Sequence, residues 1–586
     1  MSSTDTTTSP RSVSTNDWDT VYALYFPDVN QAIVAQKSSP KSLSYSGSDD
    51  DGPYSLAGTF GDWQLVTGGD GENLHLQVPV TAATLTLPGT PATDDAAATE
   101  PKTTTLSLVL VTIEVKLGWV NAAQDANTLN LTVSTASPAP TQPAVAIVNV
   151  DYGANTLNLP QRGIFTQSVE QCLLGNAGAF KHVFSSISLN ASLDTKPGFQ
   201  WTVPTATLYA VVDQEDATDT QDFARSIFAV LCMTEGRPSP GAHQVDPFAI
   251  PVGDGTKTVN SAFLISPARI LENMILPGLS LMFRGNPPTS SFSLTAGGLV
   301  LTNNVELQFT DQQLDNGNTV NPTVSAQNFS ISMMGPLIEV KMTDLHFDYV
   351  SGTTVHIDHT STVSLVLNSA GQFKMDLTNS TNHATVTQSD AVYIASIATT
   401  IGLALATAAV GGLLGGVAAP VTDVLPIAVG EAGDEIGAGA IEMAPVVLED
   451  AADGAAAAAN DVGNVGGDDV MAAVTAAANG APSKFSVFFA SFWGKALVVL
   501  TKALVGGSVA IVNFAVKYAA LKNDGEIPTL DAFGTQVMAP ITWPNLKMPA
   551  AGGTLGDQLV SGKLNGAFQV GLNLEFDHTP AATPAA

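Results

Sequence analysis

Basic residues are scarce in this chain of 586 residues. It has 22 Lys and Arg against 53 Asp and Glu, which gives a formal net charge of −31 at pH 7. Nucleic-acid backbones are bound by clustered cations, and no basic cluster appears, so we expect no nucleic-acid binding. The same charge opposes contact with an anionic bilayer. Neutral lipids or hydrophobic small molecules therefore fit the electrostatics better than anionic headgroups do.

Cysteine is almost absent, because Cys172 and Cys232 are the only two. Two thiols in so long a chain do not form a disulfide framework. Both lie in apolar surroundings, which predicts buried, unreactive side chains. Residues 1–15 also lack the apolar core of a secretory signal peptide. We therefore expect synthesis and residence in the cytoplasm of the producing cell, with any release using a route not encoded in this sequence.

Catalytic and cofactor motifs are missing as well. The sequence contains no G-x-S-x-G, H-E-x-x-H, Walker A or C-x-x-C pattern. The chain is accordingly predicted not to be an enzyme and to need no cofactor.

One group of His and Asp residues is a candidate metal site. Alternate residues of a strand share a face, so four side chains on two neighbouring strands could converge: His346, Asp348, His356 and Asp358. They occupy the polar, outward face, and their convergence depends on an unknown register. We therefore expect no metal site.

The N-terminal part shows a helical period followed by strand signals. Residues 1–15 are polar and expected to be disordered. From Asp17, apolar residues recur at helical spacing, which predicts a helix with one aromatic-rich face, kinked or split at Pro27. Residues 37–60 are expected to form a solvated loop, and 68–71 to form a hairpin turn.

Beyond this turn the sequence predicts further strands and one helix. A strand over 106–120 has apolar residues on both faces and should be covered on both sides. Helix signals follow at 165–174, with strands at 183–193 and 205–212. From 285 to 385 the pattern alternates almost throughout, which predicts an antiparallel meander with one apolar face.

A long apolar and acidic region follows this meander. Residues 391–422 carry no charge and contain overlapping G-x-x-x-G pairs, and residues 423–480 carry 11 acidic residues and no basic ones. Residues 485–520 are again apolar, with three lysines. The length of the first stretch is that of a transmembrane helix. Its Ala, Gly and Thr content and the spacing of the lysines favour buried helices instead, and membrane insertion stays the alternative.

Several segments resemble one protein family. Residues 259–279 read VNSAFLISPARILENMILPGL, and related wording occurs at 16–23, 60–64, 204–213 and 540–544. These segments resemble the forty-seven-kilodalton and Orf-X proteins encoded beside botulinum-type and insecticidal toxin genes, a branch of the TULIP (tubular lipid-binding) superfamily. The resemblance is good over residues 16–280 and weak over 390–525.

The resemblance implies a fold and a ligand-binding groove. We expect an α+β, mostly antiparallel β protein in which highly curved sheets wrap long helices, with an apolar Ala/Gly-rich helical segment at 391–520. The expected division is an N-terminal TULIP-like lobe over 16–258 and a C-terminal β-rich lobe over 259–586, with an acidic loop at 423–480. The helix near the N-terminus would line the groove, through the side chains Trp18, Tyr22, Tyr25, Val29 and Ile33.

Three functions follow from these expectations. The first is a non-enzymatic protein that binds a lipid or another hydrophobic ligand, as an accessory to a bacterial, insecticidal-type toxin system. Binding would gain about 0.8 kcal/mol per buried methylene, so a chain of about twelve carbons could contribute roughly 10 kcal/mol before entropic costs. The second is an assembly partner of sister TULIP proteins or of a toxin, with its groove filled by its own 391–520 segment. The third is a membrane-inserting effector that uses this segment. In the first two the protein contacts membranes at most peripherally and could be released with a toxin complex.

Overall fold

The computed structural model describes most of the chain outside the apolar and acidic region. The described residues are 12–388, except 51, 90–99, 124, 137–142, 190–199, 216–219, 254–256, 280–282, 310–311, 314–318, 351–352 and 368–372, together with 441–442, 446–447, 530–549 and 555–577. The predicted helical segment 391–520 and the predicted acidic loop 423–480 therefore lie almost entirely outside the described residues.

One large antiparallel sheet contains strands from both ends of the chain and from its middle. Its strand order is β11-β12-β1-β13-β28-β27-β22-β21-β20-β15-β14, with β16, β19, β23, β24 and β25 attached beside this path. These strands are β11 Pro204–Glu215, β12 Gln221–Thr234, β1 Thr20–Tyr25, β13 Ser261–Ile265, β28 Ala567–Leu572, β27 Leu559–Asn565, β22 Thr353–Leu367, β21 Leu337–Val350, β20 Phe329–Met334, β15 Val300–Asn303, β14 Phe292–Leu294, β16 Leu307–Gln308, β19 Thr323–Val324, β23 Phe373–Gln388, β24 Ile441–Glu442 and β25 Val446–Val447.

Three smaller sheets complete the β structure. A six-stranded sheet contains β2 Ser42–Asp49, β3 Gly52–Phe60, β4 Gln64–Asp70, β5 Asn73–Leu87, β6 Lys102–Val115 and β9 Val145–Asp151. A four-stranded sheet contains β26 Ile541–Thr542, β10 Ser185–Ser188, β8 Asp125–Val133 and β7 Leu117–Ala122, and a two-stranded one contains β17 Gln312–Gln313 and β18 Thr319–Val320.

The described helices are few and short. They are α1 Phe26–Gln36, α2 Leu159–Asn176, α3 Pro267–Ile270, a π-helical turn Leu271–Ile275, α4 Leu276–Leu279 and α9 Leu530–Met538. In the part of the chain that the structure describes, none of them combines the length and apolar character needed to cross a membrane. The expectation of a mostly antiparallel β protein is thus confirmed.

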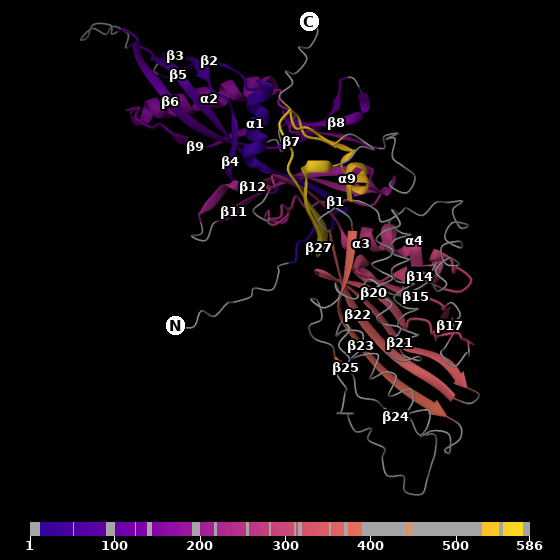
Figure 1. Ribbon diagram of the computed structural model, residues 1–586. Helices are drawn as coiled ribbons and strands as arrows, with labels where there is room; N and C mark the ends of the chain where they lie inside the picture. Colours follow the sequence, from indigo (N-terminus) through magenta and orange to yellow (C-terminus); the bar gives the residue numbers. More distant parts are fainter. Residues whose placement is uncertain are drawn as a thin grey trace, which may run out of the picture.

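The two ends of the chain meet in the middle of the large sheet. Strand β1 pairs with β12 and β13, and β13 pairs in turn with the C-terminal strand β28. In Figure 1, α9 and β27 lie between the part that contains α1 and α2 and the part that contains β20–β23. The predicted boundary at residue 258 falls next to β13, whose partners come from both ends of the chain. The division into two lobes stays a prediction.

Several local expectations are wrong, and the structure gives the reasons. The predicted helix from Asp17 is a strand, β1, followed by α1, because β1 is hydrogen-bonded on both edges and Pro27 begins the helix where its missing N–H costs nothing. The predicted loop 37–60 is the hairpin β2–β3, in register from Ser42↔Thr59 onward. Residues 12–15 are ordered, since Val13 pairs with Gly566.

Strand β6 is covered on one face only, contrary to expectation. Its inward residues alternate up to Leu106 and resume at Val109, and Leu108 between them is 56% exposed with a positive φ of 45°. The register with the neighbouring strand β5 skips Leu108, because Ala82 pairs with Ser107 and Val80 with Val109. The alternation of buried and exposed residues therefore changes phase where the sheet is irregular. In the sequence this phase change looks like a strand with two apolar faces, although only one face is buried.

Other predictions are confirmed. The hairpin turn expected at 68–71 lies at Gly71 and Glu72, between the end of β4 and the start of β5, with Gly68 and Gly71 at positive φ. The helix at 165–174 lies within α2, and the strand meander of 285–385 contains β14 to β23. Both cysteines are buried.

Candidate functional site

The five predicted groove residues do not share one surface. Tyr22, Val29 and Ile33 belong to the main core, whereas Trp18 belongs to a second core on the other side of the large sheet. The indole N–H of Trp18 donates to the carbonyl of Ala242 at 3.1 Å. Tyr25 is only partly buried, at the end of β1. Trp18 precedes β1, and Tyr25, an odd number of positions from Tyr22 along β1, packs against the second core. The role of these residues in ligand binding stays a prediction.

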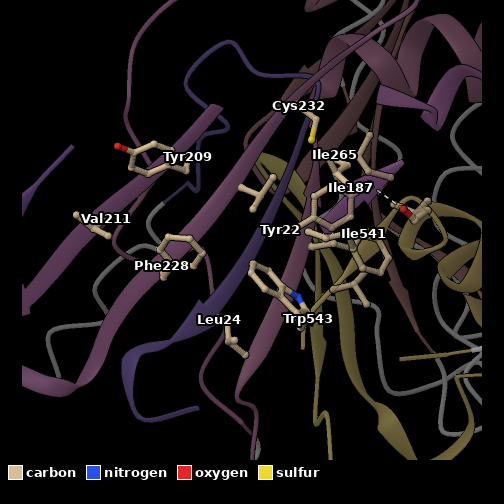
Figure 2. Close-up of a cluster of buried hydrophobic side chains, with 14 of the residues drawn as sticks. Tyr22, Leu24, Ile187, Tyr209, Val211, Phe228, Cys232, Ile265, Ile541 and Trp543 are labelled. Carbon is tan, nitrogen blue, oxygen red and sulfur yellow. Dashed lines mark hydrogen bonds between the residues drawn. The ribbon is translucent and has the colours of Figure 1, made fainter. Parts of the chain in front are cut away.

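The interior beside β1 is filled by the C-terminal segment. The hydroxyl of Tyr22 donates to the carbonyl oxygen of Val537 in α9, at 2.7 Å, and burial raises the pKa of this phenol. The ring of Phe228 meets that of Trp543 at 6.0 Å. Figure 2 shows Tyr22, Phe228 and Trp543 facing the same interior, with Ile541 nearby. Val537 and Trp543 thus pack into the interior beside β1 and β12.

A row of aromatic side chains continues from this point toward α2. Phe228 contacts Phe184 (5.6 Å between ring centroids), Phe184 contacts Phe180 (6.3 Å), and Phe180 stacks on Trp63 (4.7 Å). His182 lies beside Phe184, and its burial lowers the pKa of the imidazole to about 3. Such ring pairs stabilise a core beyond their buried area.

This row ends at a small pocket between α2 and the six-stranded sheet. The pocket has a volume of about 170 Å³ and is lined by Pro40, Lys41, Ser42, Phe60, Trp63, Cys172, Leu173, Asn176 and Ala179. Its wall is apolar, and its polar residues include Lys41, which is ion-paired with Asp62. An apolar cavity of about 150 Å³ can bind benzene. A ring or a short aliphatic group therefore matches this volume.

Charged side chains join the start of β1, the end of β12 and α3. Arg269 is fully buried, and its guanidinium contacts Glu235 and also Glu272 at 2.8 Å. Asp19, 1% exposed, accepts hydrogen bonds from the backbone N–H and hydroxyl of Thr234 and pairs with Arg237 at 3.2 Å. The ion pairs of this cluster hold α3 against the start of β1, so we assign the cluster a structural role.

The His and Asp residues considered for metal binding come together only in part. His346 and His356 lie opposite each other in register, with ring centroids 5.9 Å apart. Their Nδ1 atoms contact Asp344, whose backbone oxygen is 3.0 Å from His346 and whose carboxylate is 2.6 Å from His356. Asp348 accepts instead from Thr354. Among the described residues, no three His, Cys, Asp or Glu form a metal-binding group.

Sequence reasoning missed both the pocket and the ion cluster. The pocket depends on α2 lying over β2 and β3, which were expected to be a loop. The charges of the cluster are spread from residue 19 to residue 272, so no local motif combines them. The sequence signal for the ion cluster was present only in two family-like segments, 16–19 and 266–269, which contain Asp19 and Arg269.

Two solved structures share this fold. The P47 protein of Clostridium botulinum A2 aligns with a TM-score of 0.51 at 15% identity, covering 96% of this chain and 98% of that one. P47 of Clostridium botulinum E1 aligns with a TM-score of 0.50 at 13% identity, covering 95% and 99%. At such low identity these matches define the fold class alone.

Sequence comparison then gives the family. The chain belongs to the OrfX-like family, described as Protein OrfX2/OrfX3/P47, whose model matches residues 15–433. Protein OrfX3 of Paraclostridium bifermentans is 29% identical over 306 residues, 49% of this chain and 58% of that protein. Protein OrfX3 of Clostridium botulinum is 28% identical over 292 residues, 46% and 55%. The chain thus spans little more than half the length of these curated relatives. The resemblance to Orf-X and P47 proteins is confirmed.

Proposed function

We propose that this chain is a non-enzymatic accessory protein of a bacterial toxin system and that it acts by binding a hydrophobic ligand. Membership of the OrfX-like family supports the accessory role. The observation that carries the ligand is the apolar pocket of about 170 Å³ under α2. Helices α1 and α2, each packed against a sheet, are consistent with a TULIP-like arrangement.

The pocket limits the kind of ligand. Its volume corresponds to one aromatic ring or a short aliphatic chain, which is less than the twelve-carbon chain considered from the sequence. Transfer of about six buried carbons would contribute roughly 5 kcal/mol before entropic costs. The ligand class proposed is therefore a small apolar molecule, or the end of a lipid chain.

The proposal can be tested with a ring-sized probe. Fluorobenzene added to the full chain should give a saturable change in its ¹⁹F signal. Ala179 is exposed and lines the pocket mouth, so Ala179→Trp should block binding without disturbing the core. Ala57→Trp, on the exposed side of β3, is the matched control and should bind as wild type does. Native mass spectrometry and solvent extraction of the purified protein should show a small apolar molecule.

A second function is favoured by the filled interior. Val537 and Trp543 occupy the interior beside Tyr22 and Phe228, as expected of an assembly partner whose groove is filled by its own chain. The predicted filling by 391–520 lies almost entirely outside the described residues and stays a prediction. If fluorobenzene does not bind and extraction yields nothing, assembly with sister proteins or a toxin becomes the leading function.

A further inference from the structure

A wide surface hollow lies at the end of β1, far in sequence from the α2 pocket. It has a volume of about 620 Å³ and is lined by Tyr25, Arg225, Pro251, Val252, Gly253, Lys257, Thr258 and Val259. Two of the chain's few basic side chains, Arg225 and Lys257, thus face one hollow. No carboxylate is among the described residues that line it.

The two cations are available to a ligand. Within the described residues, no ion pair joins Arg225 or Lys257 to a carboxylate. Arg225 hydrogen-bonds the hydroxyl of Tyr25, and both side chains line the hollow. Lys257 makes one long contact, 3.4 Å, to the backbone oxygen of Asp557. Both side chains are exposed.

The nearest carboxylates are already engaged elsewhere. Burial raises the pKa of Tyr25, and the nearby carboxylates of Asp222 and Asp28 raise it further. Asp28 accepts a hydrogen bond from the side-chain amide of Asn260 at 3.1 Å. Asp222 accepts from the backbone N–H of Ala224, also at 3.1 Å. Neither of them lines the hollow.

Exposed apolar side chains lie on the same segments as the two cations, Val252 among the lining residues and Phe223 on β12. Val252 is 80% exposed at the rim, and Phe223, two residues before Arg225 on β12, is 38% exposed. Arg and aromatic residues beside exposed apolar groups are typical of the energetically important part of protein interfaces. Small-molecule sites bury most of their ligand, which this hollow, open to solvent, does not favour.

We propose that this hollow docks a protein partner through an acidic side chain flanked by apolar residues. The partner's carboxylate would lie between Arg225 and Lys257, with its apolar neighbours on Val252 and Phe223. Charge complementarity selects the occupant, because a local cationic surface on a chain of net charge −31 attracts carboxylates only at short range. The proposal rests on the assembly function given above and does not depend on the α2 pocket.

Labelled peptides test the proposal on the full chain. The probe is a fluorescein-labelled peptide in which Asp alternates with Val and Phe, and its control is the same peptide with every Asp replaced by Asn. The Asp peptide should bind at least about tenfold more tightly, and binding should weaken as salt rises. Arg225→Glu should abolish the preference, and Lys257→Gln should reduce it.

Lys341→Glu is the matched control, because Lys341 is exposed on β21 and carries the same charge. It should leave peptide binding unchanged. Equal binding of both peptides, or equal loss in Arg225→Glu and Lys341→Glu, would overturn the proposal. Two results would overturn the assignment of a protein partner. One is that phenylacetate binds as tightly as the peptide, and the other is that phosphatidylserine vesicles bind and lose this binding in Arg225→Glu. The fluorobenzene assay on the same samples reports separately on the α2 pocket.

Discussion

The core around β1 and the core of β20–β22 are built in different ways. Near β1, segments far apart in the chain are joined by specific contacts, such as Tyr22 to Val537 and Asp19 to Thr234. In β20–β22, apolar side chains simply alternate along neighbouring strands, as Ile331 and Val340 do in register. The first core depends on individual polar and aromatic contacts and the second on a repeated pattern. Substitutions should therefore affect the two cores differently.

The largest effect should come from Arg269→Ala. The Nε of Arg269 lies 4.0 Å from the carboxylate of Asp19, so this change leaves a buried carboxylate with fewer cationic partners. It should lower the free energy of unfolding by about 3–5 kcal/mol. Urea denaturation measures it, with the exposed Lys341→Ala as a control that should stay within about 0.5 kcal/mol of wild type. An effect below about 1 kcal/mol would show that the ion cluster does not hold β1 to α3.

Phe329→Ala tests how independent the β20–β22 core is. Phe329 is fully buried, and its ring centroid lies 5.5 Å from that of Phe283. Truncation should therefore lower the free energy of unfolding by about 3–5 kcal/mol. In the described register β22 meets β27 at one residue pair, Val366↔Lys563, and hydrogen exchange should therefore increase in 292–365 and not in β1 and β12. Phe228→Ala should give the opposite distribution, and equal exchange everywhere would mean one cooperative core.

Acid should weaken the core near β1 through His182. Its pKa falls from 6.5 to about 3 because of burial, so below pH 6.5 the unfolded chain binds a proton that the folded chain does not. Stability should thus decrease by about 1.4 kcal/mol per pH unit as the pH falls from about 6.5 toward 3. His182→Phe should flatten this dependence in denaturation at pH 7 and pH 4, and an unchanged slope would assign the loss to other groups.

A smaller effect is expected from Tyr22→Phe. The carbonyl of Val537 is near the C-terminal end of α9, where helical carbonyls lack intrahelical partners, and loss of the hydroxyl leaves it unpaired at a cost of about 1 kcal/mol. Faster hydrogen exchange in α9 should accompany this loss. Tyr54→Phe removes a longer bond to Gln167, 3.4 Å, and should cost less.

The sequence alone determined the features that repeat locally. The alternation over 285–385 predicts the antiparallel strands because a strand with one buried face has a period of two. The glycines of 68–71 predict a turn because they accept positive φ. The wording of 259–279 and its companion segments was sufficient to identify the family.

Only the tertiary structure decided which segments meet. The apolar spacing of residues 18–25 fits a helix, yet partners on both edges make it a strand. The Tyr22–Val537 bond spans 515 positions, and the hollow combines β1, β12 and residues 251–253 and 257–259. A local period reports the faces of one segment, whereas contacts between distant segments are set by sheet order, which no single segment contains.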